Sequence, residues 1–315
     1  MIMNQTPIQL LGNFEGNTLY IKREDLLPYC FGGNKARKAM LFFRTIDEKK
    51  YDCVVTYGSS SSNHCRVVSN MCAARKIRCI IISPDSASKP TYNSLMMKKF
   101  GAEIRNVPVA QVHDTIEDTL NEVKAEGYNP YFIPGGGHGN LGTQAYVDCY
   151  REIKAFEKEN DLSFDFIFLA SGTGTTQAGL VCGKMIENDD RSIVGISIAR
   201  KNPYGRNVIC ESIHDFLGDR VTKEQIDKQV IFIDKYNGGG YGVENKEILL
   251  TIENVLTSYG IPLDVTYTGK AFYGMQRYLN ENEILGRKVL FIHTGGAPLF
   301  FDWLNSLADD TERNS

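Results

Sequence analysis

The sequence predicts an α/β protein with open, twisted, mainly parallel sheets and flanking helices. Two observations predict this fold class. Short apolar segments of strand length alternate with segments of helix length along most of the chain, a pattern typical of parallel sheets covered by helices. The chain has 315 residues, which is larger than a single hydrophobic core usually supports. This length favours two domains of ordinary size.

The first half of the pattern predicts a smaller α/β unit. Segment 53–56 reads Cys-Val-Val-Thr and is typical of a buried strand, and segment 112–126 has apolar residues at 112, 116, 120 and 123, on one face of a helix. The expected strands are 53–56, 79–83, 104–107 and 131–133, and the expected helices are 63–75, 91–100 and 112–126.

A second unit follows the long helix expected over 141–160. Its most apolar segment, 164–170, is expected to be a central strand, and a helix is expected at 177–187. The remaining expected elements are strands at 193–199, 230–234 and 289–293, helices at 244–258 and 270–282, and a closing helix that contains Trp303. We therefore expect a smaller domain over 39–140 and a larger domain formed by 1–38 and 141–315.

Composition excludes several classes of function. The 35 basic and 38 acidic residues are spread along the chain, and without a basic block we expect no nucleic-acid partner. No apolar run reaches the roughly 18 residues of a membrane helix, and no signal peptide is visible. We therefore expect a cytoplasmic protein without a membrane partner.

The eight cysteines form no C-x-x-C pair, so neither a zinc ribbon nor a thioredoxin-type site is indicated. Cys65, Cys72 and Cys79 recur every seven residues, but buried free thiols explain this spacing better than a metal site does. We expect no metal, and reduced thiols agree with a cytoplasmic location.

The motif SGTGTT, residues 171–176, follows the central strand and opens a helix. Backbone N–H groups and the helix dipole bind anions at such a position, most often a phosphate. The motif lacks the Gly-Lys-Ser/Thr of a Walker loop and the acidic residue of a dinucleotide fingerprint. A tight turn alone would need fewer glycines and hydroxyls, so the motif favours a phosphate site.

The motif GSSSSNHCR, residues 58–66, has the same placement after strand 53–56. Ser62 or Asn63 can cap the following helix, but four serines exceed what one cap needs. A second anion site, for example for a substrate carboxylate, would use these hydroxyls and the N–H groups. With one anion loop in each domain, we expect an active site in the cleft between the domains.

The motif GGNKARK, residues 32–38, brings Lys35 into the first turn of a helix. Burial or cationic neighbours lower the pKa of a lysine enough for amine chemistry. A lysine and a loop that binds only a phosphate suggest pyridoxal phosphate, which is held by both. On these residues alone, a surface lysine in a basic patch with Arg37 and Lys38 explains the motif equally well.

Five motifs in this order carry a resemblance: LYIKREDLLPYCFGGNKARK, SNHCR, SGTGTTQAGL, YTGKAFYGM and IHTGG. Together they resemble the 1-aminocyclopropane-1-carboxylate deaminase and D-cysteine desulfhydrase family, pyridoxal-phosphate enzymes of the tryptophan-synthase-β-like fold type II. The resemblance runs from about residue 5 to residue 305 of the sequence, and it implies a homodimer that acts on a small amino acid.

The resemblance also implies roles for individual residues. Lys35 would bind the cofactor covalently and later move the α- or β-proton. Asn63 would contact the phenolic oxygen of the cofactor ring, and Ser62 and His64 would join it in binding the substrate carboxylate. Ser62, Tyr267 and Tyr241 would lie beside the reacting atoms, and Thr268 or Thr294 would face the pyridine nitrogen. The phosphate would be held by Gly172, Thr173, Gly174, Thr175 and Thr176.

Two positions distinguish activities within the family. The ring-opening deaminases carry a glutamate after the tyrosine and a leucine in the late motif, whereas this chain has Thr268 and Thr294. A hydroxyl is a weaker and neutral partner for the pyridine nitrogen, which favours β-elimination that yields a 2-oxo acid and ammonia. Sulfide would be released if cysteine is the substrate.

The sequence also departs from the family. The serines at 59–62 and the stretch GGGHGNLGT at 135–143 look unlike the usual members. His138 adds an ionisable group near a glycine loop, although a solvated loop histidine is the simpler explanation. These departures keep three alternatives open: a β-replacement synthase, a 1-aminocyclopropane-1-carboxylate deaminase, and a binding homologue that has lost catalysis. An intact Lys35 beside two anion loops argues against the last.

Overall fold

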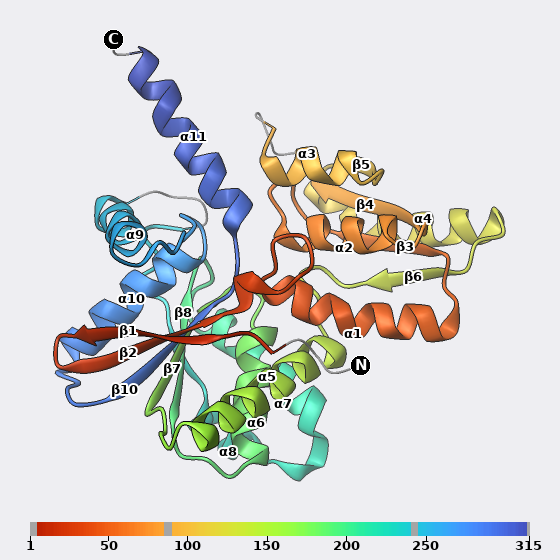
Figure 1. The fold of residues 1–315 in the computed structure, drawn as a ribbon. Helices are drawn as coiled ribbons and strands as arrows, with labels where there is room; N and C mark the ends of the chain where they lie inside the picture. The colour runs from red at the N-terminus through yellow and green to blue at the C-terminus, as the bar shows by residue number, and fades with distance from the viewer. Residues whose placement is uncertain (1–4, 85–89, 241–244, 314–315) are drawn as a thin grey trace.

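The computed structural model describes residues 5–84, 90–240 and 245–313, and within them it contains two sheets (Figure 1). The larger sheet has the strand order β1-β2-β10-β7-β8-β9. All its neighbours pair in parallel except β1 and β2, which form an antiparallel hairpin. Its strands are β1 (Ile8–Phe14), β2 (Asn17–Arg23), β7 (Phe166–Ser171), β8 (Ser192–Ser197), β9 (Ile231–Ile233) and β10 (Lys288–His293).

The smaller sheet is parallel throughout and has the order β5-β4-β3-β6. Its strands are β3 (Cys53–Tyr57), β4 (Arg78–Pro84), β5 (Glu103–Val107) and β6 (Pro130–Ile133). The expected α/β class with mainly parallel sheets is therefore confirmed. The hairpin β1-β2 was not expected from the sequence.

Helices cover both faces of each sheet. The larger sheet is covered by α5 (Asn140–Glu159), α6 (Thr175–Ile186), α7 (Tyr204–Leu217) and α8 (Lys223–Gln229) on one face, and by α9 (Lys246–Tyr259), α10 (Thr268–Glu281) and the start of α11 (Ala297–Arg313) on the other. The smaller sheet is packed between α1 (Asn34–Lys49) with α2 (Asn63–Ala73) and α4 (Val112–Ala125), while α3 (Tyr92–Lys99) lies against α2 and α11.

The two-residue repeat of a strand explains this layering. In β7, Ile167 and Leu169 enter the core with α5 and α6, whereas Phe168 and Ala170 enter the core with α9 and α10. Because both faces of the strand are buried, its sequence reads as one continuous apolar run. The run that predicted a central strand is therefore the strand in the middle of the larger sheet.

Helix α1 continues without a break through residue 38, where the sequence suggested a division. Its later residues Phe42, Phe43 and Ile46 pack in the core of the smaller sheet with Val54 and Ile81. The other suggested division, between 140 and 141, lies at the first turn of α5.

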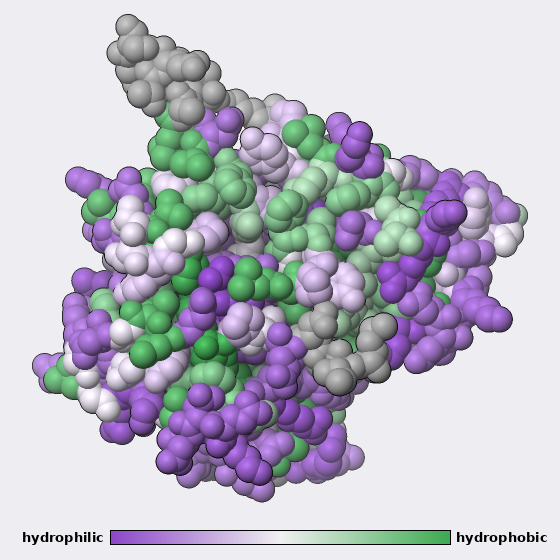
Figure 2. Space-filling model, viewed as in Figure 1, coloured by the Kyte–Doolittle hydropathy of each residue, from purple (hydrophilic) through white to green (hydrophobic). Residues whose placement is uncertain are grey.

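The molecular surface is mainly hydrophilic at its lower and right-hand edges in Figure 2, whereas hydrophobic residues gather beside the base of α11. In the described part of the chain, no helix is both long enough and apolar enough to cross a membrane.

Candidate active site

A cavity of about 560 Å³ lies where strands of both sheets end. Segments that follow β3, β6, β7, β8 and β10 line it, in agreement with the rule that open α/β sheets bind ligands at the carboxyl ends of their strands. No aspartate or glutamate is found among the described residues that line it. The cavity brings together most of the predicted site residues: Lys35, Ser62, Asn63, His64, Gly172, Thr173, Gly174, Thr176, Tyr267 and Thr294.

Lys35 lies in the first turn of α1, and its Nζ donates a hydrogen bond of 3.1 Å to the carbonyl oxygen of Gly136. Burial lowers the pKa of Lys35 from its usual 10.5 to about 8. A larger fraction of this amine is therefore neutral near physiological pH than of an ordinary lysine, which makes it a better nucleophile and base.

Lys38 follows one turn later and is fully buried. No described residue accepts a hydrogen bond from its Nζ. Burial and the nearby charge of Lys35 lower its pKa well below the usual value. The side chain packs against the loop at Gly137, next to His138. A buried amine without an acceptor is costly, and Lys38 itself is not among the described residues that line the cavity.

A buried ion-pair network fixes the start of α1 on the larger sheet. The guanidinium of Arg37 donates to both carboxylate oxygens of Glu24, which follows β2, and to Glu152 of α5 at 2.6 Å. Lys22 donates to the same Glu152 at 2.9 Å. Burial raises the pKa of Glu24, but Arg37 and Lys22 outweigh it and lower the pKa to about 2. The network therefore holds charged groups that orient the helix carrying Lys35.

The loop after β7 has the geometry of an anion site. Gly174 has a φ of +91°, a conformation that a side chain would strain, and it caps α6, whose first residues are Thr175 and Thr176. The hydroxyl of Ser171 is buried without a described hydrogen-bond partner and lines the cavity. Arg200, after β8, donates to the carbonyl oxygen of Thr173 at 3.3 Å. Backbone N–H groups, hydroxyls and a cation therefore converge on this loop.

Thr175 is the member of this motif that does not line the cavity. Its methyl group faces Gly142, and its hydroxyl lies 2.8 Å from Nδ1 of His138. His138 is therefore a hydrogen-bonded, half-buried residue behind the loop rather than a solvated one. Burial, then Lys38 and Arg200, lower the pKa of His138.

The second loop that we predicted to bind an anion is the start of α2. The hydroxyl oxygen of Ser62 caps this helix by accepting from the backbone N–H of Cys65 at 3.2 Å. Oδ1 of Asn63 accepts from Arg66 at 2.7 Å and from Asn93 at 3.1 Å. Both contacts fix the orientation of the Asn63 amide, whose Nδ2 remains a donor. The backbone N–H groups of Asn63 and His64 belong to the first helical turn, which makes no intrahelical bonds through them.

His64 is buried as a neutral imidazole. Burial, followed by the charges of Lys35 and Lys38, lowers its pKa to about 3. The hydroxyl of Thr56 donates to the carbonyl oxygen of Ile133, so its oxygen accepts from Nε2 of His64, at 2.9 Å. The proton of the imidazole is therefore on Nε2, and Nδ1 is an acceptor. His64 can donate to a carboxylate through its backbone N–H, not through its ring.

Tyr267 lines the cavity, but the side chain of the next residue, Thr268, turns away from it. The Thr268 hydroxyl donates to Oδ2 of Asp264 at 2.7 Å and accepts from the Asp264 N–H at 2.8 Å. Asp264 is fully buried and also accepts from the backbone N–H groups of Thr266, Tyr267 and Thr268. Thr268 thus fixes a turn beneath Tyr267. Of the two threonines predicted to face the pyridine nitrogen, Thr294 lines the cavity and Thr268 does not.

Tyr241 lies outside the described residues. The residues before it are held by Lys270, whose buried Nζ donates to the carbonyl oxygen of Asn237 at 2.9 Å and to that of Gly240.

Asn34 and Arg200 line the cavity without having been predicted as site residues. Lys38, also not predicted, is buried against the loop at Gly137, whereas Ser171 belongs to the predicted motif SGTGTT. Asn34 and Lys38 belong to GGNKARK, where their spacing from Lys35 places them on the same helical turn. Arg200 had no signal in the sequence, because it follows an ordinary strand.

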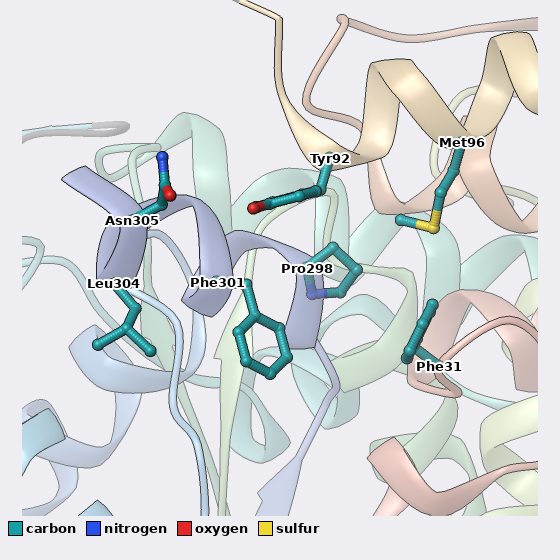
Figure 3. Close-up of a pocket in the computed structure, with 7 residues that line it drawn as sticks. All are labelled: Phe31, Tyr92, Met96, Pro298, Phe301, Leu304 and Asn305. Atoms are coloured by element: carbon teal, nitrogen blue, oxygen red, sulfur yellow. The ribbon is translucent and has the colours of Figure 1, made fainter. Parts of the chain in front are cut away.

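A second hollow, an apolar groove of about 490 Å³, has a different character. Figure 3 shows Phe301, Leu304 and Pro298 of α11 opposite Tyr92 and Met96 of α3, with Phe31 below Met96. Its polar side chains are the phenol of Tyr92 and the amide of Asn305. None of the predicted site residues lines this groove, so the candidate active site is the cavity around Lys35.

Comparisons with known proteins match nearly the whole chain. A family model described as "Pyridoxal-phosphate dependent enzyme" matches residues 1–295. A D-cysteine desulfhydrase of Serratia proteamaculans is 30% identical over 96% of this chain and 94% of its own. A Pyrococcus abyssi protein provisionally named a 1-aminocyclopropane-1-carboxylate deaminase is 34% identical over 95% of this chain and 91% of its own. A crystal structure of an ACC deaminase homologue superimposes with a TM-score of 0.86 at 33% identity, and covers 98% of this chain and 95% of that one.

Proposed function

Since the chain belongs to the family of pyridoxal-phosphate dependent enzymes, we propose that it is a lyase of the D-cysteine desulfhydrase type. It would remove the β-substituent of a small amino acid and yield a 2-oxo acid and ammonia, with sulfide as the third product from cysteine. The observation that carries this proposal is the absence of any aspartate or glutamate among the described residues that line the cavity.

The residues of the cavity fit the cofactor. The hydroxyl of Ser171 lines the cavity and lacks a described partner, which suits a phosphate. We assign the phosphate to the loop Gly172–Thr176 with Arg200 at its side, the ring's phenolic oxygen to Nδ2 of Asn63, and the pyridine nitrogen to Thr294. Thr175 and Thr268 would act indirectly, since their hydroxyls are engaged by His138 and Asp264.

When bound, the cofactor supplies an electron-accepting ring that stabilises negative charge at the α-carbon of the amino acid. The N–H groups of Asn63 and His64 and the hydroxyl of Ser62 would bind the substrate carboxylate. Lys35, with its lowered pKa, would take the α-proton. The bond from the β-carbon to the leaving group then breaks, its electron pair leaves with sulfur, and the Tyr267 hydroxyl would donate a proton. Water converts the released enamine to the 2-oxo acid and ammonia.

The neutral partner at the pyridine nitrogen supports elimination over ring opening. A carboxylate there would keep the nitrogen protonated and the ring strongly electron-accepting, whereas the Thr294 hydroxyl is neutral. Thr268, the residue that stands where the ring-opening deaminases carry a glutamate, is buried against Asp264.

Product analysis tests this function. The holoenzyme is incubated with each enantiomer of cysteine, with serine and with 1-aminocyclopropane-1-carboxylate, and Lys35→Ala serves as the control. Pyruvate and sulfide from cysteine are the expected products. 2-Oxobutanoate from the cyclopropane would establish the deaminase alternative instead. A β-replacement synthase would form little pyruvate until a second nucleophile is added. No turnover of any of these substrates would contradict the proposal.

We further propose two domains, a homodimer and a cytoplasmic location. The separate cores of the two sheets support the domains, and the unbroken helix α1 favours a boundary before Asn34 over one at residue 38. The exposed Phe31, Phe301 and Leu304 of the apolar groove support self-association, which sedimentation would test. All eight cysteines are free, as expected in a reducing compartment.

A further inference from the structure

Asn34 connects three segments of the active site. It is the first residue of α1, directly before Lys35. Its backbone N–H donates to the carbonyl oxygen of Thr294 at 2.9 Å, and its side-chain Nδ2 donates to the hydroxyl oxygen of Thr176 at 3.0 Å. Lys35, Thr294 and Thr176 each line the cavity. One residue therefore fixes the position of α1 relative to the loops after β10 and β7.

Two glycines allow this contact. A Cβ at Gly33 would lie 2.7 Å from the carbonyl oxygen of Thr294, and a Cβ at Gly295 would lie 2.7 Å from the Cα of Gly33. The two backbones can approach this closely only without side chains. The close approach brings the N–H of Asn34 to Thr294 and its amide to the start of α6.

The direction of the side-chain hydrogen bond matters for an anion. An amide nitrogen only donates, so the oxygen of Thr176 is the acceptor in its contact with Asn34. The single proton of the Thr176 hydroxyl then remains for another acceptor. Because Thr176 lies in the first turn of α6 and lines the cavity, that acceptor would be an anion at the helix N-terminus.

We propose that Asn34 is a positioning residue that orients the Thr176 hydroxyl as a donor to the cofactor phosphate. This inference rests on the proposed function, because it assigns the phosphate to the loop Gly172–Thr176. It adds a link between the phosphate and the lysine: the residue that orients the phosphate's hydroxyl donor is bonded directly to Lys35.

Three variants distinguish a change in the orientation of the Thr176 hydroxyl from the loss of that hydroxyl. Asn34→Ala removes the amide. Asn34→Asp keeps the size but replaces the donor by a carboxylate, which would accept the Thr176 proton and repel a phosphate. Thr176→Val removes the hydroxyl itself. Asn160→Ala is the matched control, since this amide only donates to the carbonyl oxygen of Phe156 at the end of α5.

The test compares two ligands of the apoenzyme by direct titration: pyridoxal phosphate, and pyridoxal, which lacks the phosphate. We expect Asn34→Ala to weaken the binding of pyridoxal phosphate by about tenfold or more, the usual effect of losing a hydrogen bond to a charged group. The affinity for pyridoxal should not change. Asn34→Asp should weaken the binding of pyridoxal phosphate further. In the double variant Asn34→Ala/Thr176→Val, the two losses should not add, because they act on one contact.

Equal weakening of both ligands would show that Asn34 only supports the fold, and would overturn the inference. Unchanged affinity for pyridoxal phosphate in Asn34→Ala and Asn34→Asp would also overturn it, and leaves the proposed function intact if the enzyme still forms pyruvate. Failure of the wild-type apoenzyme to bind pyridoxal phosphate would overturn both. Should Asn34→Ala not fold, Asn34→Asp and Thr176→Val still decide the question.

Discussion

The Nζ of Lys35 lies 3.1 Å from the carbonyl oxygen of Gly136, a residue 101 positions later in the chain. The acceptor belongs to the glycine-rich stretch 135–143, and it lies next to Thr173 of the loop after β7. The lysine is therefore held by a neutral carbonyl oxygen and not by a carboxylate. No acidic residue in the described part of the chain forms an ion pair with it, which agrees with the lowering of its pKa by burial.

The pH dependence of covalent cofactor binding follows from that pKa. Only the neutral amine attacks an aldehyde, and burial lowers the pKa of Lys35 to about 8. The rate at which the apoenzyme captures pyridoxal phosphate should rise with pH, with its midpoint near 8, and level off above it. Rapid-mixing absorbance between pH 6 and 10 measures this rate. A rate that still rises tenfold per unit above pH 9 would contradict a lowered pKa.

Loss of Arg37 should strongly destabilise the fold. Arg37→Met leaves Glu24 buried without its main counter-charge, which costs roughly 3–5 kcal/mol of unfolding free energy. The control is Lys228→Met, which removes an exposed pair with Glu224 worth about 0.5 kcal/mol. Denaturant unfolding at pH 7 compares the two variants.

The same network predicts the acid sensitivity of the wild type. The pKa of Glu24 is lowered in the folded chain from its ordinary value of 4.5 to about 2. A lowered carboxyl pKa contributes stability that is fully present above pH 4.5 and is lost as the pH falls from 4.5 towards 2. In Glu24→Gln this part of the pH dependence should be missing. Equal slopes of the two proteins in acid unfolding would contradict the assignment.

Introducing the glutamate of the ring-opening deaminases at Thr268 should not convert the activity. Burial raises the pKa of Asp264, which contacts the Thr268 hydroxyl directly. Thr268→Glu would place a second carboxylate against it, and we expect a loss of about 2–4 kcal/mol in stability. Thr268→Ser keeps the hydroxyl and should remain close to the wild type. Thermal unfolding and assays with 1-aminocyclopropane-1-carboxylate measure both effects.

Tyr267→Phe should separate cofactor binding from turnover. Its hydroxyl is assigned to proton transfer and not to holding the cofactor, so the visible absorbance band of the holoenzyme should persist. The turnover number should fall by about 10²–10⁴, the range for loss of a general acid. A variant that loses the band would show instead that Tyr267 holds the ring.

The central strands were predictable because a strand that is buried on both faces is continuously apolar. The two strand-to-helix loops at the cavity were predictable because they are rich in glycine and hydroxyl residues. Lys35 was predictable only together with the loop that begins at Ser171. The roles of Thr175 and Thr268 were less predictable. Each follows a residue that lines the cavity, but its own side chain points away from the cavity. Thr175 contacts His138, and Thr268 contacts Asp264.

The remaining contacts depend on distances that no motif encodes. Arg200 reaches Thr173 only because β8 lies beside β7. The hairpin β1-β2 was missed because β1 is an edge strand whose side chains are mostly exposed or half-buried, so that its apolar pattern is weak.

Helix α1 begins in the cavity with Asn34 and Lys35, and its later turns pack in the core of the smaller sheet. The phosphate loop belongs to the larger sheet. A cofactor attached to Lys35 and held by that loop would be a covalent and ionic crosslink between two separate cores. It would then determine the cooperativity of unfolding: the loaded protein would melt as one unit, whereas the apoprotein would lose one core before the other.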